Sequence, residues 1–326
     1  MYFPDKDKTG FYITVSSVDI SSENRADIEA ILGYGDTTYM NDKSLYITDE
    51  FHKYEYGWNH IKTKIIKFTI DKGLLGYGGA GIVPGRLLNQ FSMDEYNGYF
   101  RVATTENSYS NNLFVLGPAL DIVGSITNLA EGEKIYSVRF MGDFGYIVTY
   151  REIDPLFAID ISDPTKPRVT GQLKIPGFSN YLHPISGDVL LGIGRDAVGA
   201  IPKGLKLSLF NVSDKTDPKE ICNLILGDNA YAEVLENHKA AMFNPSKGML
   251  AFDCSIREKD GWFDGAIIID YNNNTLTEKG RIERKINSRA YDNRLLYIGD
   301  VIYYIEYGLI RSFNINTLKP ISELSF

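Results

Sequence analysis

The sequence predicts an all-β fold, a β-propeller of four-stranded antiparallel blades, with six full blades and an N-terminal half-blade. The first observation is Asn97-Gly98, which stands between two runs of alternating apolar and polar residues. Both central residues of a two-residue type I′ turn need positive φ, so Asn-Gly in this setting predicts a β-hairpin. The second observation is that glycine-containing turns recur every 44 to 61 residues, at Gly142-Asp143, Gly187-Asp188, Lys247-Gly248 and Gly299-Asp300. Repeats of about this length, with four short strands each, are typical of propellers.

The expected strands follow this repeat along the chain. Residues 11–20 and 27–32 form an incomplete first unit, and the first full unit is expected at 37–41, 44–49, 64–71 and 74–83. The second unit combines the Asn97-Gly98 hairpin with strands at 112–116 and 121–126. Four further units are expected at 134–175, 180–227, about 239–284 and 288–326. We label the four strands of each unit a to d in chain order, and we expect residues 1–326 to form a single propeller domain.

A short polar residue ends strand c in four of these units, at Asp160, Asn211, Asp270 and Asn314. Asp and Asn side chains in tight turns accept hydrogen bonds from backbone N–H groups close by in the chain. We therefore interpret these residues as turn formers and not as ligands.

Composition excludes several classes of protein. A chain of 326 residues with 44% hydrophobic residues, 22 Tyr and 17 Phe can bury a large β core. The net charge of −8 argues against nucleic acid as a partner. No apolar run reaches the roughly 20 residues of a membrane span. The start of this chain lacks the apolar region of a signal peptide. The two cysteines, Cys222 and Cys254, are too few for a disulfide framework, and we expect both to be buried free thiols.

Several long segments carry a resemblance to a known family. They include VPGRLLNQFSMDEYNGYFRVATT, IYSVRFMGDFGYIVTYREIDPLFAIDISDPTKP and IPGFSNYLHPISGDVLLGIGRD. In these segments the chain resembles secreted bacterial and archaeal proteins with a C-terminal β-propeller domain. The resemblance implies an extracellular or cell-envelope location and a C-terminal portion of a longer protein. It brings no catalytic residues with it.

Loop lengths predict which face of the blades binds other molecules. The a–b and c–d turns leave one face and are mostly short, whereas the b–c and d–a connections leave the other. Long insertions fall in the b–c connections, at 50–63, 196–204 and 255–265. Loops of variable length on a rigid scaffold commonly carry function. We therefore expect the b–c/d–a face, here called the long-loop face, to bind a partner.

Two groups of residues are candidate binding sites on that face. The insertion EFHKYEYGWNHIKT carries polar-tipped aromatic residues at alternating positions, Tyr54, Tyr56, Trp58 and His60, with Phe51 and His52 before them. Such side chains suit a recognition surface, although this loop would equally suit covering a neighbouring blade. The second group is expected where strand a enters the central channel, at Asn89, Gln90, Tyr136, Arg139, His183, Arg195, Asp196, His238 and Lys239. A polar ring of this kind could hold an anion, a sugar or a metal ion, or it could bond strand ends between blades.

The sequence is compatible with two functions. No nucleophile motif, P-loop or metal-ligand spacing occurs, and only four histidines are present. The favoured function is therefore a non-catalytic extracellular or cell-envelope propeller that binds a protein, peptide or glycan through its long-loop face. The alternative is a hydrolase or lyase with a polar site at the channel mouth, around Arg139, His183 and His238. No cofactor and no metal site are predicted, and an ion in the channel is left open.

Overall fold

The computed structural model describes residues 11–21, 26–55, 57–107, 109–150, 154–198, 201–286 and 293–326. Within these residues the chain forms β-strands and four short 3-10 helices, and no helix is long and apolar enough to cross a membrane. By its contacts the chain divides into two compact units, Met1–Tyr146 with Ile159–Val169, and Ile147–Ala158 with Thr170–Phe326. We call them unit 1 and unit 2 and describe each by itself. That residues 1–326 form a single domain stays a prediction.

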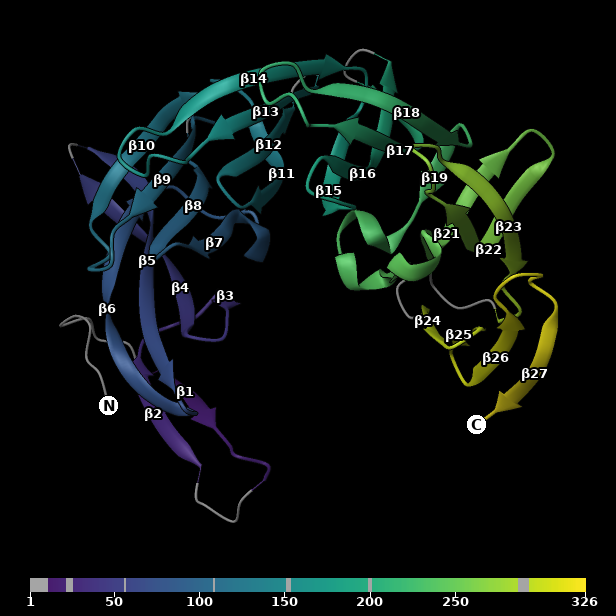
Figure 1. The fold of residues 1–326 in the computed structure, drawn as a ribbon, viewed down its shortest axis with the longest axis horizontal. Helices are drawn as coiled ribbons and strands as arrows, with labels where there is room; N and C mark the ends of the chain where they lie inside the picture. The colour runs from purple at the N-terminus through teal and green to yellow at the C-terminus, as the bar shows by residue number, and fades with distance from the viewer. Residues whose placement is uncertain are drawn as a thin grey trace. The chain divides into compact units, whose positions relative to one another are not determined.

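The first four sheets confirm the predicted half-blade and the first three blades (Figure 1). β1 (Tyr12–Ser17) and β2 (Asp27–Leu32) pair as an antiparallel hairpin. The next two sheets have the orders β3-β4-β5-β6 and β7-β8-β9-β10, and a third runs β11-β12-β13-β14. Their strands are β3 (Thr37–Met40), β4 (Ser44–Glu55), β5 (Trp58–Asp71), β6 (Leu74–Pro84), β7 (Met93–Tyr96), β8 (Tyr99–Thr105), β9 (Asn111–Leu116), β10 (Ile122–Leu129), β11 (Lys134–Met141), β12 (Phe144–Tyr150), β13 (Asp154–Asp160) and β14 (Arg168–Ile175). The helix η1 (Gln90–Ser92) precedes β7.

Three further sheets complete the predicted series. Their orders are β15-β16-β17-β18, β19-β21-β22-β23 and β24-β25-β26-β27, and β20 also pairs with β21. The strands are β15 (Phe178–Pro184), β16 (Val189–Val198), β17 (Ile201–Asn211), β18 (Lys219–Leu226), β19 (Asn229–Tyr231), β20 (Ala241–Asn244), β21 (Met249–Glu258), β22 (Gly261–Asp270), β23 (Thr277–Glu283), β24 (Arg294–Ile298), β25 (Val301–Glu306), β26 (Leu309–Asn314) and β27 (Pro320–Ser325). The 3-10 helices are η2 (Glu233–Leu235), η3 (His238–Ala240) and η4 (Pro245–Lys247). The fifth full blade thus begins at Asn229, ten residues before the predicted start, because its first strand is interrupted by η2 and η3.

Turn chemistry explains the hairpins. Asn97 and Gly98 have φ of 52° and 82°, both positive, as the predicted turn requires. Strand c ends as expected at three positions, where Asp160, Asn211 and Asn314 accept backbone N–H bonds of 2.9 to 3.0 Å from residues two further on. The side chains therefore define where strand c stops.

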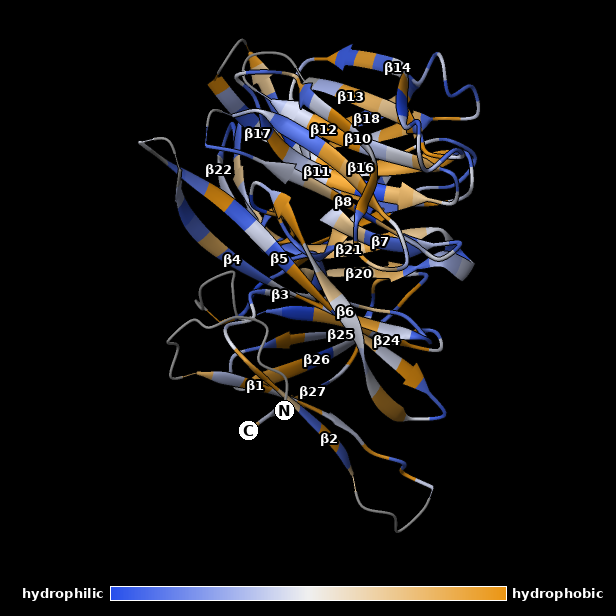
Figure 2. Ribbon diagram, turned by 90° about the vertical axis from the view of Figure 1, so that its left-hand side faces the viewer, coloured by the Kyte–Doolittle hydropathy of each residue, from blue (hydrophilic) through white to orange (hydrophobic). Residues whose placement is uncertain are grey.

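The three b–c insertions are hairpins and not loops, so this part of the prediction is wrong. β4 and β5 pair as far as Glu55 and Trp58, β16 and β17 as far as Val198 and Ile201, and β21 and β22 as far as Glu258 and Gly261. Their alternating polar and apolar residues, visible as bands along β5 in Figure 2, suit strands in which backbone groups pair across the hairpin.

The burial prediction for the cysteines is half right. Both are free, and Cys254 is buried in a central strand. Cys222 is only half-buried, because β18 is an edge strand along which exposed and partly buried residues alternate.

Glycines in the fourth strand of a sheet receive the c–d turn of the next sheet. A Cβ atom placed on each of these glycines would overlap that turn. The pairs are Gly81 with Leu120, Gly124 with Pro164, Gly171 with Lys215, and Gly280 with Leu318. A glycine at this position therefore allows successive sheets to approach closely.

Replacing Gly124 by valine is expected to lower the free energy of unfolding by about 1–3 kcal/mol, because the new side chain must displace the Pro164 carbonyl. Urea unfolding followed by circular dichroism measures this loss. Ser125→Val, at an exposed position on the same strand, is the matched control. Equal stability of the two variants would show that the glycine is not needed for close packing.

Candidate functional site

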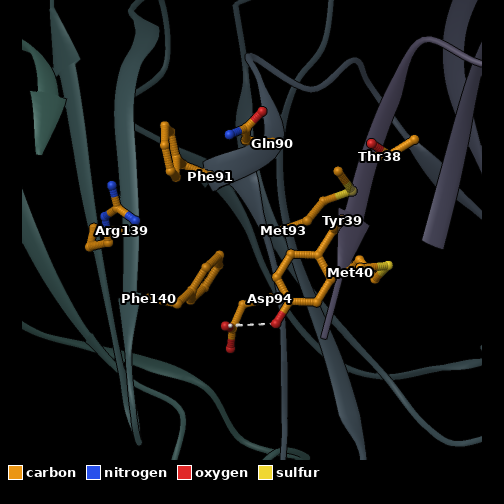
Figure 3. Close-up of a pocket in the computed structure, with 9 residues that line it drawn as sticks. All are labelled: Thr38, Tyr39, Met40, Gln90, Phe91, Met93, Asp94, Arg139 and Phe140. Atoms are coloured by element: carbon orange, nitrogen blue, oxygen red, sulfur yellow. Dashed lines mark hydrogen bonds between the residues drawn. The ribbon is translucent and has the colours of Figure 1, made fainter. Parts of the chain in front are cut away.

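A cavity of about 380 Å³ lies beside the first strands of three successive sheets in unit 1 (Figure 3). We call it the first-strand pocket. β3, β7 and β11 each supply two or three of the residues that line it, and η1 supplies two more. The residues that line it are Thr38, Tyr39, Met40, Gln90, Phe91, Met93, Asp94, Arg139 and Phe140. The structure thus brings together Gln90 and Arg139, two of the residues predicted for the channel mouth.

Asn89, also predicted for this group, positions one wall of the pocket. Its side-chain oxygen accepts a hydrogen bond of 2.9 Å from the Phe91 backbone N–H and so caps η1. The cap holds Phe91 opposite Arg139, whose guanidinium carbon lies 4.1 Å from the centre of the Phe91 ring. This distance is typical of a cation–π contact. Arg139 is half-buried and presents a positive charge to the cavity.

The one carboxylate of the pocket is already neutralised. Asp94 forms an ion pair with Arg101, whose side chain is only 3% exposed. Tyr39 donates its hydroxyl to the other oxygen of Asp94 over 3.4 Å, drawn as a dashed line in Figure 3. Burial raises the pKa of Tyr39, so the hydroxyl stays protonated and able to donate. The Asp94 carboxylate therefore lines the pocket as half of an ion pair, and Arg139 adds a guanidinium group to the lining.

A second carboxylate, Glu95, joins the two sheets behind the pocket. It accepts hydrogen bonds from Asn41 at 2.9 Å and from Lys67 at 3.4 Å. Burial raises the pKa of Glu95, but the bonds from Asn41, Ser44 and Lys67 together outweigh burial and lower it overall. The side chains of Asp94 and Glu95 therefore lie on opposite faces of β7, because successive side chains of a strand alternate between its faces.

In unit 2, the predicted residues His183 and His238 lie in an aromatic cluster. The Nδ1 atom of His183 is 3.1 Å from the Tyr181 hydroxyl, and its ring stacks on Phe243 with 3.7 Å between ring centres. The His238 ring packs 5.9 Å from the Tyr181 ring. Arg195 donates to the Ala230 carbonyl at 2.9 Å, which links two neighbouring sheets. These contacts pack aromatic rings together and bridge two sheets, and a binding role for the three residues stays a prediction.

In the aromatic insertion at 50–63, Tyr54 and His60 do not share one surface. Tyr56 lies outside the described residues, and the side chain of Trp58 is not described. Tyr54 pairs with Asn59 across the hairpin, whereas His60 pairs with Lys53. Successive residues of a strand point to opposite faces, so Tyr54 and His60 lie on opposite faces of the hairpin. Tyr54 is 75% exposed and His60 is half-buried.

Sequence reasoning missed the aromatic walls of the first-strand pocket, Tyr39, Phe91 and Phe140. Aligning strand a of each repeat would have brought Tyr39, Asp94 and Arg139 to comparable places, and the Asn89 cap signal would have located Phe91. Within the described part of the chain, His, Cys, Asp and Glu form no group of three that could hold a metal ion.

Comparison of sequences identifies relatives. The sequence model of the family described as "Beta propeller domain" matches residues 1–318. A protein of Archaeoglobus fulgidus, described as uncharacterized, is 40% identical over 263 residues, or 81% of this chain and 39% of the relative. An uncharacterized protein of Methanocaldococcus jannaschii is 47% identical over 188 residues, or 56% of this chain and 28% of the relative. The matches thus span well under half the length of these curated relatives.

Comparison of structures confirms the predicted fold class, a β-propeller of four-stranded antiparallel blades. The periplasmic gluconolactonase PpgL of Pseudomonas aeruginosa is similar with a TM-score of 0.54 and 10% identity, over 96% of this chain and 95% of that one. Apo AztD of Citrobacter koseri is similar with a TM-score of 0.53 and 13% identity, over 96% of this chain and 80% of that one. At such identities the likeness shows the fold alone.

Proposed function

The chain belongs to the Beta propeller domain family, and from this premise we propose that it is a non-catalytic binding protein of the cell surface or envelope. We place its binding site in the first-strand pocket and propose a glycan as its ligand. The observation that carries the proposal is the pocket lining, which combines three aromatic side chains with a half-buried arginine. The envelope location rests on the resemblance to exported proteins.

Sugar chemistry fits this lining. A sugar ring has an apolar face, which packs on aromatic side chains, and an edge of hydroxyl groups that donate and accept hydrogen bonds. Tyr39, Phe91 and Phe140 supply aromatic surface, while Gln90 and Arg139 supply amide and guanidinium groups. A few polar groups set among aromatic ones is the usual composition of a small-molecule site.

Among glycans, the positive charge of Arg139 favours an acidic sugar. Arg139 brings a guanidinium group to the pocket lining, and its guanidinium carbon lies 4.1 Å from the centre of the Phe91 ring. A guanidinium group binds a carboxylate through two parallel hydrogen bonds. We therefore propose that Arg139 binds the carboxylate of a uronic acid residue. A protein or peptide segment would lack the repeated hydroxyl groups that this pocket suits.

Titration calorimetry with the full chain tests the proposal. D-galacturonate and the neutral sugar D-galactose are each added in the millimolar range, and galacturonate is expected to bind more tightly. Arg139→Gln should weaken galacturonate binding about 10–100-fold, because it removes a hydrogen bond to a charged group. Arg168→Gln removes the same charge from a side chain in unit 1 that is 73% exposed, and it should leave the affinity unchanged.

Two results would contradict the proposal. One is that neither sugar binds, and the other is that Arg139→Gln binds galacturonate as well as the parent chain does. The thermal midpoint of each variant shows that it remains folded. NMR spectra of methyl galacturonide incubated with the protein address the enzyme alternative, since release of methanol would support a hydrolase in place of a binding protein.

A further inference from the structure

A second cavity, of about 570 Å³, lies among the connections of unit 1. We call it the connection pocket. It is bounded by the segment between β6 and β7, the segment between β8 and β9, and the start of β11. The lining residues are Arg86, Leu87, Leu88, Thr105, Glu106, Asn107, Tyr109, Lys134 and Ile135. Lys134 is the first residue of β11 and lines the connection pocket, whereas Arg139 lies near the other end of β11 and lines the first-strand pocket. The two pockets therefore lie at opposite ends of this strand.

Backbone bonds make the walls of the connection pocket rigid. Arg86 and Thr105 exchange two backbone hydrogen bonds of 3.0 and 2.9 Å. Gly85, with φ of 86°, permits this approach, since a Cβ atom there would come within 2.9 Å of the Thr104 hydroxyl. The Gly85 carbonyl in turn accepts a bond of 2.7 Å from the Thr63 hydroxyl. These bonds hold the backbone of Arg86 in place at the edge of the connection pocket.

Tyr109 adopts a backbone conformation that is rare for an aromatic residue. Its φ is 55°, in the left-handed region. A 3.0 Å bond from its N–H to the Glu106 carbonyl and a 3.0 Å bond from Gly132 to its own carbonyl hold it there. The Lys134 ammonium lies 4.7 Å from the centre of its ring. Strained residues that the surroundings hold in place cluster at binding sites, so this outlier points to function.

The connection pocket combines positive charge with an apolar wall. Arg86 and Lys134 are exposed, and neither has a carboxylate partner among the described residues, whereas Glu106 accepts a bond of 3.0 Å from Asn112. Ile135 is buried, and Leu88 is 46% exposed beside Leu87. The matching ligand carries a carboxylate next to an aliphatic group.

The surface continues beyond the pocket onto the β4–β5 hairpin. Asn107 donates to the Asn59 carbonyl over 2.8 Å and so joins the pocket wall to the hairpin. The Asn59 side chain bonds His52 at 3.1 Å, and it shares its hairpin face with the exposed Tyr54. An elongated ligand that leaves the pocket has a polar and aromatic surface next to it.

We propose that the connection pocket binds the carboxyl-terminal end of a peptide. The terminal carboxylate pairs with Arg86 and Lys134, and an aliphatic last side chain packs on Leu87, Leu88 and Ile135. The preceding residues lie along the β4–β5 hairpin. This site is separate from the glycan site. It lies among d–a and b–c connections, on the long-loop face that the sequence predicts to bind a partner.

Fluorescence anisotropy with N-terminally labelled Ala-Ala-Ala-Ala-Leu tests the proposal on the full chain. The free acid is expected to bind, and the C-terminal amide should bind at least tenfold more weakly. Arg86→Gln with Lys134→Gln should weaken the acid at least tenfold. Lys166→Gln, which alters an exposed residue of unit 1 outside both pockets, should not change the affinity.

Other outcomes overturn the peptide assignment. They are equal binding of acid and amide, no binding of either, or no effect of the double variant once its thermal midpoint shows that it is folded. Tighter binding of octanoate than of the peptide would assign the site to acyl carboxylates instead. Galacturonate titration of the double variant should match that of the parent chain, which keeps this test distinct from that of the glycan site.

Discussion

Replacing Glu306 by alanine is expected to lower the free energy of unfolding of unit 2 by about 3–5 kcal/mol. Glu306 is 1% exposed and pairs with Arg311 at 2.6 Å. Its other oxygen accepts bonds from the backbone N–H groups of Lys285 at 2.7 Å and Ile286 at 3.1 Å. The substitution therefore leaves a buried guanidinium without its charge partner and two N–H groups without an acceptor.

Urea unfolding at neutral pH measures this loss, and Lys285→Ala is its control. The Lys285 ammonium pairs with Glu323, and both side chains are more than half exposed, so this variant should unfold at an unchanged midpoint. It also keeps the Lys285 backbone bond to Glu306. The double variant Glu306→Ala, Arg311→Met should recover much of the stability, because no buried charge then remains unpaired. A loss below about 1 kcal/mol for Glu306→Ala would contradict the account.

Replacing Phe100 by alanine is expected to cost about 3–5 kcal/mol in unit 1. Phe100 is 1% exposed, and its ring stacks on Tyr46 with 4.0 Å between ring centres. It also meets Tyr39 edge-on at 6.2 Å. The ring therefore fills the core between the second and third sheets and supports one wall of the first-strand pocket, so the variant should also bind galacturonate more weakly.

Thermal and urea unfolding of three variants separate packing from other effects. Phe100→Leu keeps most of the volume and should cost under about 1.5 kcal/mol. Tyr307→Ala removes a ring that is 76% exposed and should change stability by under about 0.5 kcal/mol. If Phe100→Ala and Phe100→Leu lost equal free energy of unfolding, the cavity left by the removed ring would not be the cause of the loss.

The blades could be predicted from the sequence because their signals are local. Asn97-Gly98 defines its turn through φ angles that few other residues adopt, and Asp160 or Asn314 ends a strand by bonding the backbone two residues on. These interactions span a few residues, so a single pass along the chain finds them. The extended hairpins were mistaken for loops because polar alternation alone does not reveal whether two arms pair.

The candidate site was only partly predictable because packing between sheets creates it. Tyr39 and Phe140 stand about 100 residues apart in the chain, and nothing in either segment shows that both line one cavity. Gln90 and Arg139 are expected at the channel mouth because both fall in segments assigned to strand a, and both line the first-strand pocket. The binding role expected of His183 stays a prediction, and its stacking on Phe243 joins two sheets, which no local pattern in the sequence shows.

A crystal structure of the full chain soaked with D-galacturonate tests the central claim most directly. The account predicts density for the sugar in the first-strand pocket, with the carboxylate within hydrogen-bond distance of Arg139 and the ring among Tyr39, Phe91 and Phe140. A first-strand pocket without sugar density at saturating ligand, or density only at another place, would contradict it.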